Sequence, residues 1–309
     1  MSIKQKNFIS AVVYLHNYEA LLGDFLKSLY NTLNENFDKF EIICVNDAST
    51  DDSKTVIKTL ANNFENCMLS IVNMSFYQGI EMAMRAGVDV AIGDFVFEFD
   101  EIIIDYKPDL IMQCYDRCLQ GFDIVSCGNG NSRGSSKLFY SLYNHYSGSQ
   151  YKLQSETFRI ISRRAINRIH SMSVNTIYRK SLYAACGLKT NYIRYQATTN
   201  AVKLKKNNLK NPQDTALTSL ILFTDIAYKA TMVFTILAMF FTIVSFVYTV
   251  VVYISGSPVH GYTTMMALMS LAFFALFAIL TVVIKYLSII LGLVFHRQKY
   301  TLESIEKIT

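Results

Sequence analysis

Short apolar runs alternate with segments of helical periodicity in the first part of the chain. The apolar runs are bounded by polar clusters, as is typical of buried strands, and they cover residues 8–15, 40–45, 68–72, 95–99 and 124–127. The segments between them repeat apolar residues every three or four positions, and they cover residues 20–33, 50–64, 79–92 and 108–119. Strands that alternate with helices predict an α/β domain with a mostly parallel sheet, to which we assign residues 1–210.

The C-terminal part of the chain has a different character. Residues 230–284 contain no Asp, Glu, Lys or Arg, and they form two apolar stretches, 230–254 and 262–284, with a short polar turn between them. About 20 apolar residues are enough for a helix to cross a bilayer. A very apolar soluble core is the alternative, but a soluble domain of this size does not need two such helices side by side. We therefore predict a transmembrane hairpin.

Charge near the hairpin predicts its orientation. The turn at 255–261 contains no Lys or Arg, whereas both flanking segments are basic. The basic residues are Lys203, Lys205, Lys206, Lys210 and Lys229 before the hairpin and Lys285, Arg297 and Lys299 after it. The positive-inside rule then places the α/β domain, the tail at 285–309 and both termini in the cytoplasm.

The segment at 211–229 joins the domain to the hairpin. Asn211 and Pro212 are a typical cap and first residue of a helix, and apolar residues follow at helical spacing. Together with the lysines just upstream, this pattern predicts an amphipathic helix at the level of the lipid headgroups. A helix packed on the α/β domain is the alternative.

Composition narrows the classes of partner. A net charge of +5 fits contact with anionic lipid headgroups, but it is too diffuse to indicate nucleic-acid binding, and no nucleic-acid module is recognisable. The six cysteines form no CxxC pair and lie in the part predicted to be cytoplasmic, so we expect reduced, mostly buried thiols.

Polar residues follow three of the predicted strands. They are residues 16–19, residues 46–51, and the pair Asp100 and Glu101. Ligands of parallel α/β sheets bind at the carboxyl ends of the strands, so these residues are candidates for a binding site. Asp47, for example, can accept hydrogen bonds from a base or a ribose. For residues 46–51 the alternative is a turn that caps the next helix.

Several segments, in their order along the chain, resemble those of family 2 glycosyltransferases with the GT-A fold. Val45-Asn-Asp-Ala-Ser-Thr-Asp51 is similar to the family's V-D-D-G-S-T-D, and Ala86-Gly-Val-Asp-Val-Ala-Ile-Gly-Asp94 is similar to A-G-x-D-x-A-x-G-D. Phe139-Tyr-Ser-Leu-Tyr-Asn144 and Phe158-Arg-Ile-Ile-Ser-Arg-Arg164 are similar to segments of the bacterial polyprenyl-phosphate glycosyltransferases. That subgroup resembles dolichol-phosphate mannose synthase and ends in a two-helix membrane hairpin, so the resemblance covers nearly the whole chain.

The resemblance implies an activity. It is the transfer of a sugar from a nucleotide sugar, usually linked to UDP, to undecaprenyl phosphate at the cytoplasmic face of the bacterial plasma membrane, for cell-surface polysaccharide modification or assembly. A phosphate acceptor is already anionic, so the reaction needs no strong general base. It needs groups that hold two anions together and stabilise the departing nucleotide diphosphate. Relatives tend to self-associate through their membrane helices, so a homo-oligomer is expected.

The resemblance also implies site residues. The donor-binding residues would be Asn17, Glu19, Asp47, Ser49, Gly79 and Asp100. The acceptor-phosphate-binding residues would be Arg133, Lys137, Arg159, Arg163 and Arg164, because Arg suits bidentate phosphate contacts. Asp100 and Arg159 are expected to act in catalysis. Arg159 lies between two apolar residues, so an inward-facing guanidinium would need a partner, whereas Arg163 and Arg164 have solvated surface charges as their alternative.

A divalent metal ion is a further expectation from the resemblance. The family's D-x-D motif holds Mg²⁺ or Mn²⁺ against the diphosphate, but the second Asp is here Ile102. Glu101 is not a simple substitute, because neighbouring side chains of an extended chain point to opposite faces. An ion site that uses Asp100 and Asp105 is the remaining option.

The altered motif leaves three hypotheses. The favoured one is an active polyprenyl-phosphate glycosyltransferase with a modified metal site. The second is a glycosyltransferase that acts on another lipid-linked acceptor. The third is a catalytically silent homologue that serves as a partner subunit.

Overall fold

The structure, a computed structural model, describes residues 4–130, 140–141, 143–145, 151–172, 178–197, 226–256, 261–294 and 300–308. It divides into two compact units. One contains the N-terminal domain together with Gln298–Thr309, and the other is Leu220–Arg297. Arg133, Lys137 and most of the helix predicted at 211–229 lie outside the described residues.

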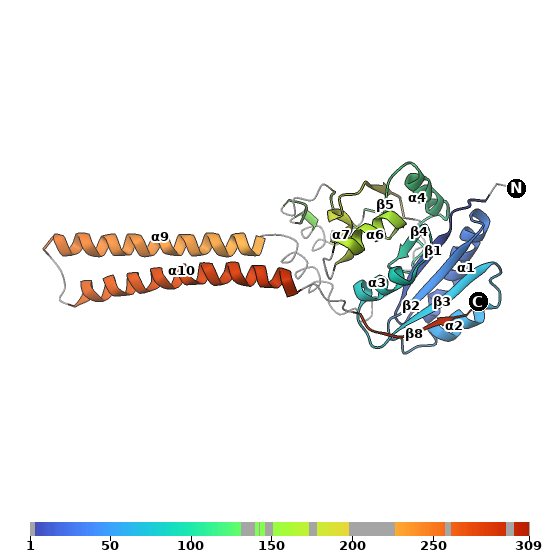
Figure 1. Ribbon diagram of the computed structural model, residues 1–309, viewed down its shortest axis with the longest axis horizontal. Coiled ribbons are helices and arrows are strands. Elements are labelled where there is room, and N and C mark those ends of the chain that lie inside the picture. Colours follow the sequence, from blue (N-terminus) through green and yellow to red (C-terminus); the bar gives the residue numbers. More distant parts are fainter. Residues whose placement is uncertain are drawn as a thin grey trace. The chain divides into compact units, whose positions relative to one another are not determined.

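The described residues of the first unit form one eight-stranded sheet, in the order β7-β5-β6-β4-β1-β2-β3-β8 (Figure 1). The strands are β1 (Ile9–Leu15), β2 (Phe40–Asn46), β3 (Cys67–Met74), β4 (Phe95–Phe99), β5 (Ile124–Gly128), β6 (Phe158–Ser162), β7 (Thr190–Arg194) and β8 (Leu302–Lys307). Strands β1 to β4 pair in parallel, as do β5 and β7. β6 runs antiparallel to β4 and β5, and β8 runs antiparallel to β3. The predicted mostly parallel α/β sheet is confirmed.

Helices cover both faces of this sheet, because alternate residues of its strands are apolar on both sides. The helices are α1 (Glu19–Asn36), α2 (Ser53–Ala61), α3 (Ile80–Val90), α4 (Asp109–Leu119), α6 (Arg163–Ser171) and α7 (Arg179–Ala185). In β1, Val13 packs into the core shared with α1, α2 and α4. Its neighbour Val12 packs into the second core, shared with α3, α6 and α7. The sheet is therefore buried on both sides, and polar groups meet solvent at its edges.

Three strands were not predicted from periodicity, and β8 is the most informative of them. Its sequence, Leu-Glu-Ser-Ile-Glu-Lys, contains only two apolar residues, and one of them, Ile305, remains 46% exposed. An edge strand that is half exposed has no continuous apolar run, which explains why the pattern was missed. The consequence is that the end of the chain, after the two apolar stretches, returns to the sheet of the N-terminal domain (Figure 1).

The second unit is a pair of helices, α9 (Ile226–Ile254) and α10 (Tyr262–Val294). The segments Met232–Ile254 and Thr264–Leu287 are long and apolar enough to cross a membrane. Large apolar side chains such as Phe234 (74%) and Ile254 (77%) are exposed, and the Ser270 hydroxyl donates to Ser245 Oγ across the two helices (3.2 Å). A helix pair that is apolar outside and carries a polar contact inside suits a lipid surrounding.

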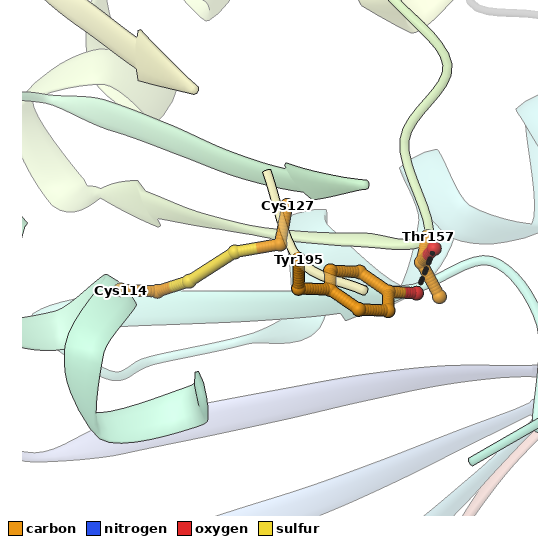
Figure 2. Close-up of a disulfide and its surroundings, with 4 residues drawn as sticks. All are labelled: Cys114, Cys127, Thr157 and Tyr195. Carbon is orange, nitrogen blue, oxygen red and sulfur yellow. Dashed lines mark hydrogen bonds between the residues drawn. A yellow bond between two sulfur atoms is a disulfide. The ribbon is translucent and has the colours of Figure 1, made fainter. Parts of the chain in front are cut away.

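The cysteines depart from expectation at one pair. Cys114 of α4 and Cys127 of β5 are joined in a disulfide, with their Cα atoms 7.5 Å apart (Figure 2). The expectation of reduced thiols is wrong for this pair, because it rested on the absence of CxxC spacing, whereas packing of α4 on β5 brings distant cysteines together. Cys44, Cys67, Cys118 and Cys186 form no disulfide and are buried, as expected.

Candidate functional site

The carboxyl ends of the central strands lie at one edge of the sheet. Leu15 pairs with Asn46, and Asn46 pairs with Asn73, so β1, β2 and β3 end side by side. Val13 pairs with Phe99, so β4 ends at the same edge. The loops that follow these strands therefore form one polar region, which is where parallel α/β sheets bind ligands.

The loops after β1 and β2 are hydrogen-bonded to each other. The Asn17 amide donates to Ser49 Oγ (3.2 Å), and Asn17 Oδ1 accepts from the Thr50 amide (2.8 Å). The Glu19 amide donates to Asp51 Oδ2 (2.9 Å). The structure thus brings together three of the residues predicted to bind the donor, namely Asn17, Glu19 and Ser49.

Asp47 ties the loop after β2 to the loop before α3. Its side chain is fully buried and accepts hydrogen bonds from the Tyr14 hydroxyl (3.1 Å) and from the Gln78 and Gly79 amides (2.8 Å each). Burial raises the pKa of the Asp47 carboxyl above its ordinary value, and these three hydrogen bonds oppose that effect. Asp47 therefore fixes the loop before α3 to the loop after β2 through buried hydrogen bonds.

Ala48 occupies the position where the resembling motif has glycine. Its φ is +51°, in the left-handed region that disfavours a side chain. The tight turn is therefore retained without the residue that best accommodates it.

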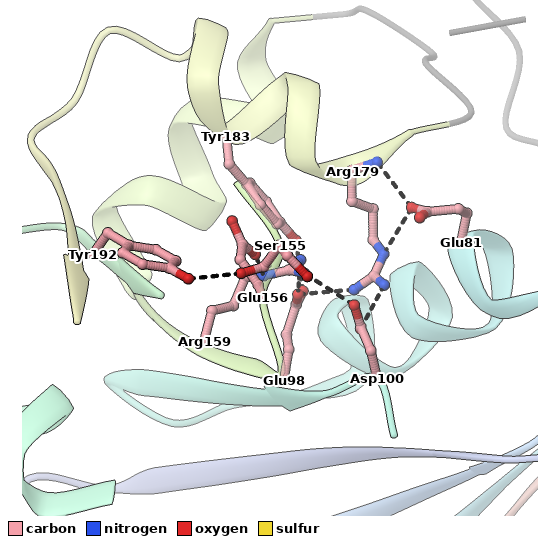
Figure 3. A network of polar contacts seen from close by, with 9 residues as sticks. All are labelled: Glu81, Glu98, Asp100, Ser155, Glu156, Arg159, Arg179, Tyr183 and Tyr192. Atoms are coloured by element: carbon pink, nitrogen blue, oxygen red, sulfur yellow. Dashed lines mark hydrogen bonds and ion pairs between the residues drawn. The ribbon is translucent and has the colours of Figure 1, made fainter. Parts of the chain in front are cut away.

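A buried ion-pair network lies beside these loops, at the end of β4 (Figure 3). Arg159 of β6 donates from Nη1 to Glu98 (2.7 Å), from Nη2 to Asp100 (3.0 Å) and from Nε to Glu156 (2.9 Å). Arg179 of α7 donates to the same two residues of β4, to Glu98 from Nη1 and to Asp100 from Nη2 (2.8 Å each). Each guanidinium is therefore held by several carboxylates at once.

Two further residues, Glu81 and Tyr183, form hydrogen bonds with members of this network. Arg179 Nε reaches Glu81 of α3 (3.1 Å), and the Tyr183 hydroxyl donates to Glu98 Oε1 (2.5 Å). Burial disfavours the charge of Arg159, but Asp100, Glu156 and Glu98 outweigh it, and the pKa of Arg159 lies well above its ordinary value. Burial would likewise raise the pKa of Asp100, but the two guanidinium groups hold it well below the usual range. Arg159 and Asp100 are therefore charged at neutral pH.

The charges in the network do not cancel. Lys180, next to Arg179, interacts electrostatically with Glu156 and Asp100. The carboxylates are Glu81, Glu98, Asp100 and Glu156, and the cations are Arg159, Arg179 and Lys180. Four negative and three positive charges give a formal sum of −1. Among the described residues, the network therefore has no excess of positive charge.

Sequence reasoning found Asp100 and Arg159 and missed the residues that connect them. Glu98 lies within the apolar strand Phe95–Phe99. Because a buried charge requires a partner, its position in the sequence already indicated a buried cation nearby. Arg179 and Tyr183 carried no such signal, because they reach the site only through the placement of α7.

Two predicted acceptor-binding residues lie elsewhere. β6 runs antiparallel to β4, so its end at Ser162 lies beside Phe95, at the start of β4. Arg163 donates there to the carbonyl oxygens of Gly93 and Ala91, and Arg164 pairs with Asp123. The structure therefore does not bring Arg163 and Arg164 to Arg159.

The residues proposed to hold a metal ion do not fit one. Both oxygens of Asp100 accept from guanidinium groups, and Ile102 is buried at the second motif position. Asp105 Oδ2 accepts from Asn129 (3.0 Å) and Oδ1 from Tyr195 (2.5 Å), whose hydroxyl also contacts Thr157 (2.7 Å; Figure 2). Across the described ranges, no three His, Cys, Asp or Glu side chains are grouped as metal ligands. Asp100 and Asp105 thus have separate partners.

Comparisons with known proteins identify the family and the fold. An uncharacterised glycosyltransferase of Synechocystis sp. is 29% identical over 194 residues, and the match spans 60% of this chain and 60% of that protein. A bactoprenol glucosyl transferase of Shigella phage SfX is 25% identical over 268 residues, 84% of this chain and 86% of that protein. An undecaprenyl-phosphate 4-deoxy-4-formamido-L-arabinose transferase of Pseudomonas paraeruginosa is 28% identical over 130 residues, 42% of this chain and 38% of that protein.

A solved structure extends the comparison to the fold. A mannosyltransferase from Pyrobaculum calidifontis, solved in complex with GDP-Man and Mn²⁺, has a TM-score of 0.50 at 12% identity, over 90% of this chain and 88% of that one. The likeness confirms the GT-A fold. The family model described as glycosyl transferase family 2 matches residues 10–187, which is more than half of the chain. The protein therefore belongs to glycosyl transferase family 2.

Proposed function

We propose that the protein transfers a sugar from a nucleotide sugar, UDP-linked by preference, to a polyprenyl phosphate at the cytoplasmic face of the bacterial plasma membrane. The product would serve cell-surface polysaccharide modification or assembly. The relatives named for bactoprenol and undecaprenyl phosphate support this acceptor. The two long apolar helices support an enzyme that works at a membrane.

One observation carries the proposal, the pair of buried guanidinium groups of Arg159 and Arg179 at the carboxyl end of β4. Each uses three of its five N–H groups on carboxylates in the described part of the chain, which leaves two for phosphate oxygens. The loops with Asn17 and Ser49 lie at the same edge of the sheet. Donor and acceptor phosphates would meet between these elements.

The chemistry follows from these groups. An oxygen of the acceptor phosphate attacks the anomeric carbon of the sugar, and the bond from that carbon to the nucleotide diphosphate breaks. The negative charge that develops on the diphosphate is stabilised by Arg159 and Arg179, which are already oriented before the substrates arrive. Asp100 and Glu98 act as positioning residues, because their carboxylates bind the guanidinium groups of both Arg159 and Arg179 and so fix their orientation.

The metal ion of the Pyrobaculum calidifontis structure belongs to that protein. Here the side chains of Asp100, Ile102 and Asp105 do not fit a divalent ion, so no step of the proposed reaction depends on one.

The test is product formation by the full-length protein in nanodiscs that contain undecaprenyl phosphate. UDP- and GDP-sugars are supplied one at a time, and glycosylated lipid is detected by mass spectrometry. We expect product with one donor class, loss of product in Asp100→Asn, and normal product in Arg164→Ala, whose side chain is 68% exposed and remote from the network. Product with a different lipid-linked acceptor, and none with the polyprenyl phosphate, would replace the proposed acceptor.

A silent homologue is the second candidate, and the charge balance of the network favours it. Among the described residues, the network's formal sum of −1 is unfavourable for a diphosphate, and no three His, Cys, Asp or Glu side chains are grouped there to hold a cation that would offset it. This candidate would be supported if no product forms with any donor or lipid while a cooperative thermal transition shows that the protein is folded.

A further inference from the structure

We infer that β8, the strand formed after the two apolar helices, positions the donor-binding loops. The inference deepens the proposed function and rests on it for the identity of those loops. β8 pairs antiparallel with β3, and two separate hydrogen-bonded connections lead from it to the loops after β2 and before α3.

The first connection passes through Gln78. Its side-chain amide donates to the Thr301 carbonyl oxygen (2.6 Å), and its side-chain oxygen accepts from the Thr301 amide (2.9 Å). The backbone amides of Gln78 and Gly79 donate to Asp47. Gln78 is therefore held through its side chain by Thr301, the residue just before β8, and through its backbone by Asp47 in the loop after β2.

The second connection crosses the sheet. Asn73 donates to Ser304 Oγ (3.1 Å) and Glu306 Oε1 (2.9 Å) of β8, and it accepts from the Asn46 side chain (3.0 Å). Asn46 Oδ1 in turn accepts from the Ser49 amide (3.1 Å). Asn73 and Asn46 are 1% and 2% exposed, so solvent does not compete for these bonds.

The segment just before β8 also contacts the last turn of α3. The Tyr300 hydroxyl donates to Asp89 Oδ2 (2.6 Å), and Tyr300 and Leu302 pack against the core on the α3 side of the sheet. Thr301 and Tyr300 thus hold the loop before α3 and the last turn of the same helix. Both sets of donor loops depend on a segment that follows the hairpin in the chain.

The test is hydrogen–deuterium exchange of the full-length protein, combined with UDP and GDP titration. Gln78→Met removes the first connection while keeping the length of the side chain. The double variant Ser304→Ala/Glu306→Ala removes the second. Lys58→Ala is the matched control for the double variant, because it removes the ion pair to Glu306 Oε2 (2.8 Å) and leaves the hydrogen bond from Asn73 to Glu306 Oε1 in place.

We expect Gln78→Met to raise exchange at residues 75–80 by roughly tenfold and to weaken the nucleotide Kd by a similar factor, since two hydrogen bonds are lost. The double variant should act on residues 46–51, and Lys58→Ala should resemble the wild type. Unchanged exchange at both loops would overturn the inference. Raised exchange in a protein whose wild type binds no nucleotide would support the positioning role and count against the proposed function instead.

Discussion

Glu98 of β4 stands directly opposite Arg159 of β6, and their side chains form a 2.7 Å ion pair although both are buried. Breaking one partner of such a pair leaves an uncompensated charge inside the protein. The pairing also sets the direction of the guanidinium, because neighbouring strands fix both backbones.

Replacing Arg159 by Lys should be strongly destabilising. A lysine ammonium cannot reach three carboxylates in the planar arrangement that the guanidinium provides. We expect a loss of about 3 kcal/mol, in the range known for a broken buried ion pair. Thermal unfolding of the full-length protein measures it. Arg164→Lys, where an exposed guanidinium pairs with Asp123, should have a much smaller effect, and equal effects of the two variants would contradict the prediction.

Glu98→Gln should separate stability from binding. The amide keeps an acceptor for the guanidinium groups and a donor toward the Tyr183 hydroxyl, but the network changes from a formal sum of −1 to neutral. We expect a loss of roughly 1–3 kcal/mol in stability together with severalfold tighter UDP or GDP binding, measured by calorimetry. Weaker binding would show that the charge of Glu98 is needed to orient Arg159 and Arg179.

Nucleotide binding should be insensitive to divalent cations. Asp100 is held by two guanidinium groups, and Asp105 by Asn129 and Tyr195, so an added ion would have to displace these partners. Titrations with EDTA and with Mn²⁺ should give the same Kd within about twofold. A large loss of nucleotide affinity in EDTA would contradict this prediction and support the metal site implied by the family resemblance.

Ala48→Gly should stabilise the protein. The backbone of Ala48 is held at φ +51°, where glycine has no steric penalty, and the gain should be roughly 0.5–1 kcal/mol. Ala20→Gly, at the start of α1, should have the opposite sign, because glycine lowers helix stability. Two thermal transitions that move in the same direction would show that the turn is not strained.

Acid should weaken the attachment of the tail at Asp89. Burial raises the pKa of this carboxyl, but hydrogen bonds from His170 and Tyr300 outweigh burial, and the pKa lies below its ordinary value. The group therefore stabilises the folded state above the pKa of the unfolded carboxyl, about 3.9, and this contribution disappears as pH falls through the lower folded pKa. Thermal transitions between pH 6 and 3 should fall less steeply in Asp89→Asn than in the exposed control Asp24→Asn.

The sequence was sufficient for the central architecture, because strands buried on both faces leave continuous apolar runs and their loops carry the polar residues. It also located Asp47 and Asp100, since both directly follow a strand. It could not place Arg179, which reaches the site through the packing of α7, or show that Arg163 points to the opposite end of β6. Those positions depend on which strands run antiparallel, and periodicity within one segment contains no information on its neighbours.

The position of β8 in the chain has a consequence for biosynthesis. Residues 302–307 leave the ribosome only after both apolar helices have emerged. Until then, β3 is an unprotected sheet edge, and its backbone groups are open to pairing with other chains. The N-terminal domain can therefore complete its sheet only after both apolar helices have been synthesised.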